Sequence, residues 1–295
     1  MTAERITIGF VGAGRVGTGL ATGFVRAGHD VVAVASRSIA SAQALAKRLP
    51  GARAGAPQEV ADRADLVFIT VPDDAIESVA ASVRWRAGCA SVHCSGAADL
   101  DTLKKAVADG ALAGGFHPLH MFGEPGESPG ALAGCAIALA GADALVEKLE
   151  GLARSVGARP LRLPEGGRAL YHASANFSGA FVIALMQETI ALWKKLGIAE
   201  GDALAALLPL LRGTVDNVER LGAAGGLGSA VARGDVGTIR RHLEVLAKEA
   251  PGSLELYRLL SRRTIPLALA KGTLDARAAR EIGVLLASSG PREDH

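Results

Sequence analysis

GFVGAGRVG, residues 9–17, is the stretch that decides the fold. It overlaps an apolar, strand-like run at residues 6–11 and leads into a segment of helical spacing at 15–27. In such a strand–turn–helix unit the first glycine permits a tight turn, the second lets the backbone approach a pyrophosphate, and the third lets the helix pack on the strand. The stretch therefore predicts a dinucleotide-binding turn. The residues expected to contact the dinucleotide there are Gly12, Gly14, Arg15, Val16 and Gly17.

The first half of the chain alternates short runs rich in Val and Ile with longer segments of helical spacing. This alternation is typical of βα units around a parallel sheet. The predicted strands are residues 6–11, 31–35, 66–71, 90–93, 112–116 and 136–139. The predicted helices between them are residues 15–27, 39–49, 76–83 and 144–156.

The second half lacks the strand pattern. After a last strand-like run at 159–163 come Ala/Leu-rich stretches, of which the first predicts one helix over 168–196. Breaks between helices are expected at Gly197, Pro209, 222–228, Pro251 and Gly272. The fold class is an α/β Rossmann-like domain followed by an all-α C-terminal domain. The predicted domains are residues 1–165 and 166–290, with a frayed tail over 291–295.

Composition and charge narrow the possible functions. The 295 residues hold 32 Lys+Arg against 30 Asp+Glu, a net charge of +2, which argues against a nucleic-acid partner because phosphate binding needs clustered positive charge. Hydrophobic residues make up 49% and charged residues 21%, as in globular proteins. With aromatic residues at 4%, we expect close helix-on-sheet packing rather than a core of large rings.

Location follows from the cysteines and the apolar runs. The 3 cysteines are an odd number and do not form a secreted disulfide framework. No leader pattern precedes the first strand, and the apolar run at 131–142 is too short to span a membrane, which takes roughly 20 residues. We expect a soluble, cytoplasmic protein without a membrane partner.

The end of the second strand predicts which dinucleotide binds. An acidic residue there would bond the ribose 2′-hydroxyl of NAD, but this chain has Ser36, Arg37 and Ser38. A guanidinium and two hydroxyls suit the 2′-phosphate of NADP(H). In the alternative, Arg37 is solvated and Ser38 caps the next helix. The loop of Val71, Pro72 and Asp73 is expected to flank the cofactor, with Asp73 or Asp74 as a helix N-cap.

Candidate substrate residues follow the next two strands, because ligands of open α/β sheets bind beyond the carboxyl ends of the strands. Ser95 and the Gly96 amide can hold a carboxylate or carbonyl, and His117, in an extended segment before Pro118, can line the same cleft. His93 fits better as a hydrogen-bonded histidine within the sheet. The spacing of histidines and cysteines does not support a metal site.

The first helix of the second domain carries two more candidates. His172 and Asn176 lie four residues apart and share a face, so that His172 can donate a proton while Asn176 orients a carbonyl. The alternative is a purely structural pair at a domain interface. Arg233 can bind a substrate carboxylate or form a surface salt bridge. Asp235 is expected to cap the following helix.

The motifs together resemble a family of NADP-dependent oxidoreductases with a Rossmann-like domain and a C-terminal helical domain of unknown function. They are GFVGAGRVG, ASRS at 35–38, VPD at 71–73, HCSG at 93–96, FHPLHMF at 116–122, YHASANF at 171–177 and ARGD at 232–235. The plan is also similar to ketopantoate reductases, pyrroline-5-carboxylate reductases, prephenate dehydrogenases and β-hydroxyacid dehydrogenases. In the last of these a Lys-x-x-x-Asn pair serves the carbonyl, and His172 replaces that lysine here. Gly228-Ser229-Ala230 departs from the Thr-Gly-Pro-like turn expected before ARGD.

The resemblance implies an NADPH-dependent reductase of a small 2-keto acid, with ketopantoate as the preferred substrate. His172, Asn176, Ser95 and His117 would then be the catalytic residues, and Ser95, Gly96, His117 and Arg233 would bind the substrate. The alternatives are imine reduction of the pyrroline-5-carboxylate type and a non-catalytic, NADP(H)-binding regulatory protein. Long apolar helices with few caps predict a homodimer through the helical domain.

Overall fold

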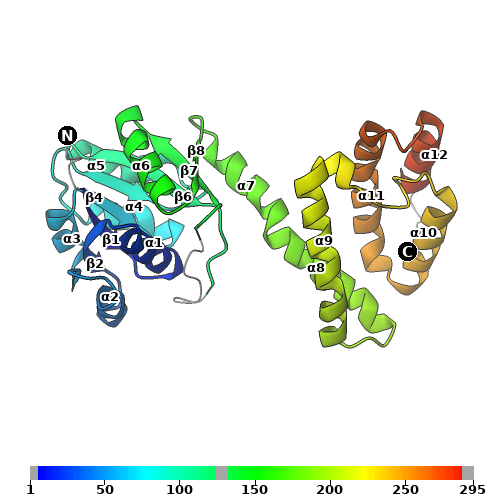
Figure 1. Cartoon of the computed structure of the whole chain (residues 1–295), viewed down its shortest axis with the longest axis horizontal. Coiled ribbons are helices and arrows are strands. Elements are labelled where there is room, and N and C mark those ends of the chain that lie inside the picture. The colour runs from blue at the N-terminus through cyan, green and yellow to red at the C-terminus, as the bar shows by residue number, and fades with distance from the viewer. Residues whose placement is uncertain (1–5, 124–131, 288–295) are drawn as a thin grey trace, which may run out of the picture. The chain divides into compact units, whose positions relative to one another are not determined.

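The structure, a computed structural model, describes residues 6–123 and 132–287 (Figure 1). The tail predicted over 291–295 lies outside these residues. The chain divides into two compact units, Met1–Ala180 and Phe181–His295. This division falls after the predicted boundary at residue 165, because the helix that begins at Arg168 is anchored to the first unit by its buried first residue.

The first unit is built on a sheet of eight strands in the order β3-β2-β1-β4-β5-β6-β7-β8. The strands are β1 (Thr7–Val11), β2 (Asp30–Ala35), β3 (Arg53–Gly55), β4 (Leu66–Ile69), β5 (Ala90–His93), β6 (Leu112–Pro118), β7 (Ala136–Gly141) and β8 (Arg159–Arg162). β1 to β6 are parallel, whereas β7 runs antiparallel to β6 and pairs in parallel with β8. The first six strands have the order of a dinucleotide-binding fold, so their carboxyl ends share one edge.

Helices cover both faces of this sheet (Figure 1). The helices are α1 (Arg15–Arg26), α2 (Ile39–Ala46), α3 (Pro57–Arg63), α4 (Ile76–Ala81), α5 (Lys104–Ala108) and α6 (Asp143–Ser155), with short turns η1 (Asp73–Ala75) and η2 (Leu100–Leu103). One apolar cluster joins the sheet to α1, α2 and α6. A second joins the other face to α3, α4 and α5. Two buried faces explain why the inner strands are almost wholly apolar.

Four phenylalanines occupy the centre of the first cluster, contrary to the expected core without large rings. Phe10, Phe68 and Phe116 lie on neighbouring parts of the sheet, and Phe24 lies on α1. The rings of Phe10 and Phe68 are stacked with centroids 5.2 Å apart, and those of Phe68 and Phe116 meet edge to face at 5.2 Å. A low aromatic content therefore did not predict their distribution, because most of the chain's phenylalanines gather at one place.

The predicted strands and long helices are found within a few residues of their expected bounds. β3, α3 and α5 were not predicted, because elements of three, seven and five residues show too little periodicity. The helix predicted over 168–196 is two helices, α7 (Arg168–Ser178) and α8 (Ala180–Lys195). Gly179 separates them with φ −115° and ψ −97°, outside the helical region.

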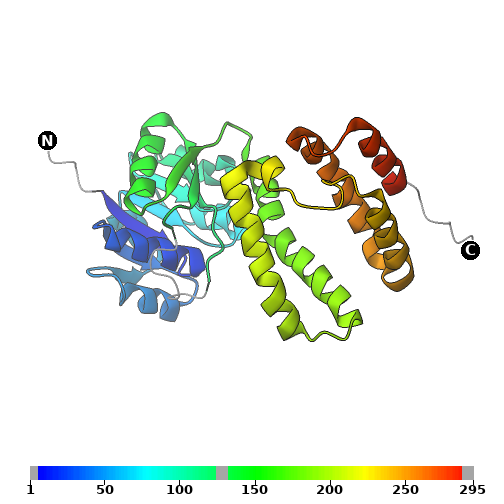
Figure 2. The ribbon, with the colours of Figure 1, turned by 45° about the vertical axis from the view of Figure 1, so that its right-hand side comes forward.

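The second unit is helical (Figure 2). After α8 it contains α9 (Glu200–Gly226), α10 (Val236–Glu249), α11 (Pro251–Lys271) and α12 (Ala276–Ala287). α8 and α9 pack around Ile190, Ala203 and Leu207, and a separate cluster joins α10, α11 and α12. Pro209 lies inside α9 and does not end it, contrary to the prediction. The break predicted at 222–228 is found at Gly222, whose φ of 71° and ψ of 172° leave the helical region.

Candidate active site

The glycine-rich turn is held between three strands. The Gly12 amide donates to the Ala35 carbonyl of β2 at 2.8 Å, and the Gly12 carbonyl accepts from the Thr70 hydroxyl beyond β4, also at 2.8 Å. Gly12 has φ +121°, and a Cβ there would lie 2.4 Å from the Thr70 carbonyl oxygen. Glycine is therefore required by the fold at this position.

The other two glycines of the motif have different roles. A Cβ on Gly17 would lie 2.3 Å from the Gly12 carbonyl oxygen, so Gly17 allows α1 to pack against the turn. A Cβ on Gly14 would meet nothing within 4 Å. Gly14 is the N-cap of α1 and offers no side-chain cap. The first amides of an α-helix have no acceptor within the helix, and those of Val16 and Gly17 therefore stay available beside the turn. This open, positively polarised helix end fits a pyrophosphate.

The segment after β2 lies at the same edge of the sheet. Arg37 is exposed there, and no carboxylate stands between Ala35 and α2. The Ser38 hydroxyl accepts from the Ser41 amide at 3.3 Å and caps α2, as the alternative interpretation expected. Ser38 therefore already has a structural partner, whereas Ser36 is half-buried at the strand end.

The loops after β4 and β5 are tied together by one hydroxyl. Ser95 donates to Asp73 Oδ2 at 2.7 Å and accepts from the amides of Ala97 and Ala98 at 3.1 and 2.9 Å. The helices η1 and α4 have no side-chain cap, so the prediction that Asp73 or Asp74 is an N-cap is wrong. The Ser95 hydroxyl thus shapes the loop after β5 through three hydrogen bonds. Its bond to Asp73 ties that loop to the segment of Val71, Pro72 and Asp73 after β4.

At the carboxyl ends of β5 and β6 the structure brings together Gly96, His117 and His172. β6 extends through Pro118, so His117 lies within this strand rather than after it, contrary to the prediction. A Cβ on Gly96 would lie 2.3 Å from His172 Cδ2 and 2.9 Å from His117 Nε2, so both imidazoles lie against the bare Gly96 backbone. The His117 and His172 ring centroids are 5.7 Å apart. His117 Nδ1 lies 3.1 Å from the Tyr171 hydroxyl. Tyr171 was missed by the sequence analysis, and its place directly before His172 was the available signal.

Burial keeps His117 and the neighbouring His93 uncharged. It lowers the pKa of His117 to about 4, with His172 and Arg168 acting in the same direction and Asp73 opposing them. Burial likewise lowers the pKa of His93 to about 4, assisted by Arg168 and His117. His93 lies within the sheet as expected, but neither of its ring nitrogens has a hydrogen-bond partner among the described residues. At neutral pH both rings are neutral.

Two further candidates lie on α7 and in the second unit. Asn176 donates from Nδ2 to the His172 carbonyl of its own helix at 3.1 Å. Arg233 is exposed in the second unit. Asp235 accepts from the Thr238 amide at 2.9 Å and caps α10, as predicted. Within residues 6–123 and 132–287 no three His, Cys, Asp or Glu side chains are grouped to hold a metal ion.

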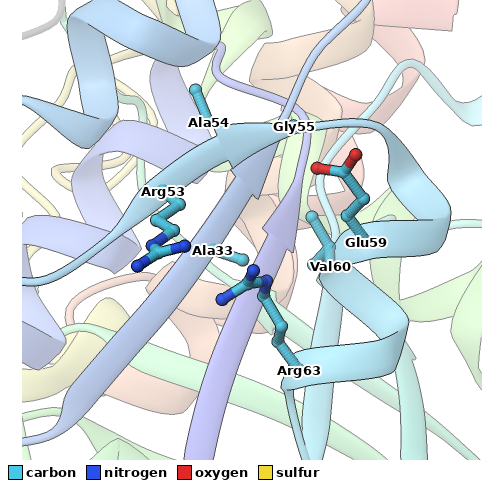
Figure 3. Close-up of a pocket in the computed structure, with 7 residues that line it drawn as sticks. All are labelled: Ala33, Arg53, Ala54, Gly55, Glu59, Val60 and Arg63. Atoms are coloured by element: carbon cyan, nitrogen blue, oxygen red, sulfur yellow. The ribbon is translucent and has the colours of Figure 1, made fainter.

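Two cavities in the first unit lie apart from the glycine-rich turn. One of about 240 Å³ lies beside β2, β3 and α3, with the side chains of Arg53, Glu59 and Arg63 around it (Figure 3). The other, of about 450 Å³, is bordered by Arg168 and by the acidic Asp99, Asp101 and Glu165. Neither contains a residue of the glycine motif.

Comparison with known families agrees with this architecture. Residues 1–118 match the model of a Rossmann-like domain, and residues 135–264 match the model of a domain of unknown function, DUF2520. The chain joins a Rossmann-like domain to a DUF2520 domain. The resemblance stated from the motifs is thereby confirmed. The comparison with curated proteins found no match.

Solved structures share the fold over nearly the whole chain. A Bacteroides fragilis protein described as a candidate NADP oxidoreductase is 24% identical with a TM-score of 0.70, covering 88% of this chain and 97% of its own. An Aspergillus terreus reductive aminase, in complex with NADPH and ethyl levulinate, is 20% identical with a TM-score of 0.61, covering 95% and 99%. The Plasmodium falciparum pyrroline carboxylate reductase with NADP bound is 15% identical with a TM-score of 0.57, covering 96% and 99%.

One stretch of the described chain has the length and composition of a membrane span. It is Arg168–Lys195, 28 residues with a mean hydropathy of 1.3. A single such stretch is weak evidence, and this one is interrupted at Gly179 and begins with a buried arginine.

Proposed function

We propose that this protein is an NADPH-dependent oxidoreductase that reduces a small carbonyl compound, with the 2-keto acid ketopantoate as the preferred candidate. The observation that supports it is the shared edge of the sheet. The open turn at Gly14 follows β1, Arg37 follows β2, and Gly96 follows β5. His117 lies near the carboxyl end of β6, and His172 of α7 lies against Gly96. Because these strands are parallel, the groups that we propose bind the cofactor and donate the proton lie at the same edge.

The turn and the segment after β2 fit NADPH. Gly14 leaves room for backbone to approach the pyrophosphate, and the first amides of α1 suit its charge. Arg37, with Ser36 beside it, suits a 2′-phosphate, and the lack of a carboxylate removes the usual partner of the NAD ribose. When bound, NADPH supplies the hydride.

The residues around Gly96 then serve the substrate. The Gly96 backbone orients the carbonyl or carboxylate, neutral His117 donates a hydrogen bond, and His172 donates the proton to the carbonyl oxygen. Asn176, through its bond to the His172 carbonyl, steadies the first turns of α7. Arg233 remains a predicted carboxylate ligand in the second unit.

The test is NADPH consumption with ketopantoate and, side by side, with pyrroline-5-carboxylate. We expect turnover of ketopantoate that falls about 10²-fold or more in His172→Gln, while NADPH affinity measured by fluorescence is retained. His120→Gln, which replaces an exposed histidine outside the cluster, is the matched control and should keep full activity. Equal turnover by His172→Gln and wild type would reject His172 as the proton donor.

A second candidate is imine reduction of the pyrroline-5-carboxylate type. Reductive aminase and pyrroline carboxylate reductase share the fold, and an imine carbon accepts hydride with less help from an acid, which suits a cluster whose His117 is neutral. Faster turnover of pyrroline-5-carboxylate than of ketopantoate would favour it. Tight NADPH binding without turnover of either compound would favour a non-catalytic, NADP(H)-responsive regulator.

We also propose that the protein is a cytoplasmic homodimer. The cysteines Cys89, Cys94 and Cys135 are free thiols, as in a reducing compartment. α8 and α9 expose apolar side chains in the single chain, among them Ile183, Leu210 and Val215. A second copy of the helical unit is the proposed cover for this surface.

A further inference from the structure

Arg168, the first residue of α7, is buried beneath the loop that follows β5. Its Nε donates to the Ala98 carbonyl at 2.8 Å, and its Nη2 donates to the Ser95 carbonyl. Only 2% of the side chain is exposed. One planar guanidinium thus bonds both ends of the loop that carries Gly96.

The sheet leaves a specific space for this guanidinium. A Cβ on Gly115 of β6 would lie 2.6 Å from Arg168 Nη1 and 3.0 Å from its Cζ. Gly115 pairs with His93 of β5, so the guanidinium lies over the point where these two strands meet. The chain therefore has glycine where any side chain would displace Arg168.

Burying this charge has a cost that the fold does not offset with an ion pair. Arg168 forms no salt bridge among the described residues, and its Nη1 has no hydrogen-bond partner there. Arg258, another buried arginine, is paired with Glu255 at 2.7 Å. Retention of a desolvated, unpaired arginine points to a role in specifying one arrangement rather than in general stability.

What Arg168 holds is the donor cluster itself. Tyr171 and His172 lie three and four residues after it, on the face of α7 that Arg168 anchors. We infer that Arg168 is a positioning residue, which clamps the Ser95–Ala98 loop onto the first turn of α7 and so sets Gly96, His117 and His172 against one another. The inference rests on the proposed function of this cluster.

The arrangement also controls the charge of His117. The ionisable groups that face it are Arg168, Tyr171 and His172 from α7, His93 from β5 and Asp73 from η1. Arg168 and His172 disfavour its protonated form, and Asp73 favours it. Removing the arginine charge should therefore raise the pH at which His117 titrates.

The experiment combines NMR titration of labelled histidines with NADPH-dependent turnover of ketopantoate and pyrroline-5-carboxylate. In Arg168→Met we expect the His117 midpoint to rise and turnover to fall about 10²-fold, with NADPH affinity retained because the Gly12–Gly17 turn is untouched. Arg168→Lys keeps the charge but not the planar fork. It should therefore keep the low His117 midpoint and still lose turnover.

Two glycine variants, Gly115→Ala and Gly114→Ala, test the same inference without changing Arg168, in case Arg168→Met does not fold. Gly115→Ala displaces the guanidinium, whereas the atoms nearest to a Cβ on Gly114 belong to the apolar side chains of Leu145, Val92 and Leu149, the closest being 2.9 Å away. We expect Gly115→Ala alone to lower turnover, at a melting temperature similar to that of Gly114→Ala. Folded variants, Gly115→Ala included, with unchanged His117 titration and unchanged turnover would overturn the inference.

The NMR titration of His117 needs no substrate. It therefore tests the positioning role of Arg168 separately from the proposed function. If wild-type protein reduces neither compound but the His117 midpoint still responds to Arg168→Met, the proposed function fails while the contact between Arg168 and the cluster stands. If wild type turns over substrate and both Arg168→Met and Gly115→Ala do so equally well, the proposed function stands and the positioning role is wrong.

Discussion

His93 places a titratable ring inside the sheet with no exposed surface and with neither ring nitrogen bonded within the described chain. Burial is the largest cause of its lowered pKa, which lies at about 4 against 6.5 for a free histidine. The folded state therefore holds the ring neutral at pH values where the unfolded chain is already protonated. Between those two values the unfolded state binds more protons, so stability must fall as the pH falls.

We predict that His93 removes on the order of 3 kcal/mol of stability as the pH drops from about 6.5 to about 4. Urea unfolding at a series of pH values should show a steeper loss in wild type than in His93→Gln, which cannot titrate. His120→Gln serves as the control and should follow wild type. Equal slopes in wild type and His93→Gln would contradict the prediction.

At the scale of the element, the glycines in the turn between β1 and α1 serve two different purposes, folding and ligand binding. Gly12 and Gly17 are glycine because backbone atoms of the turn and of Thr70 leave no room for a Cβ. Gly14 meets no such obstacle, so its lack of a side chain serves an approaching ligand. The same motif thus contains two glycines required by packing and one required by binding.

Gly14→Ala is therefore predicted to fold with a melting temperature close to that of wild type and to lose at least tenfold in NADPH affinity. Calorimetry and a fluorescence titration measure the two quantities. Gly151→Ala, at an exposed position of α6 with nothing within 4 Å, is the control and should change neither. A Gly14→Ala variant that binds NADPH as well as wild type would show that the turn does not hold the pyrophosphate.

The segment after β2 gives a second prediction at this scale. Arg37→Ala should weaken NADPH binding about tenfold and leave NADH binding nearly unchanged, because only NADPH carries the 2′-phosphate. The exposed Arg26, in the last turn of α1, offers the matched variant Arg26→Ala, which should bind both nucleotides as wild type does. Equal losses for NADPH and NADH in Arg37→Ala would contradict a 2′-phosphate contact.

At the scale of the whole molecule, the helical unit exposes more apolar surface than its own packing covers. Ile183 on α8 is 58% exposed, and Leu210 and Val215 on α9 are 67% and 57% exposed. The clusters of α8 with α9 and of α10 with α12 bury other side chains of these helices. Surface of this kind is typical of a subunit interface.

Light scattering should give the mass of a dimer for wild type and of a monomer for the double variant Ile183→Lys with Leu210→Glu. Charges at these two positions would have to be desolvated in a dimer, which is costly. Val245→Lys, at a residue of α10 that is 58% exposed, is the control and should leave the dimer intact. A monomeric wild type would disprove the proposal.

Much of the fold and part of the site could be predicted from the sequence. The glycine spacing, the alternation of apolar runs and helical segments, and the missing acid after Ala35 are local patterns, and local patterns determine strands, turns and helix starts. His117 and His172 were singled out because each stands beside a recognisable strand end or helix start. β3 and α3 were not predicted, because they have too few residues to show a hydrophobic periodicity.

Only the tertiary structure decided which polar groups meet. Ser95 was expected to bind substrate, but its hydroxyl bonds Asp73 and two amides. The sequence predicted only that a helix begins at Arg168. In the fold, Arg168 lies beneath the Ser95–Ala98 loop, some seventy residues away in the chain. The sequence by itself determined the order of elements and the nucleotide-binding turn. The partners of a buried charge depended on strands far apart in sequence, because desolvation and hydrogen bonding act between neighbours in space.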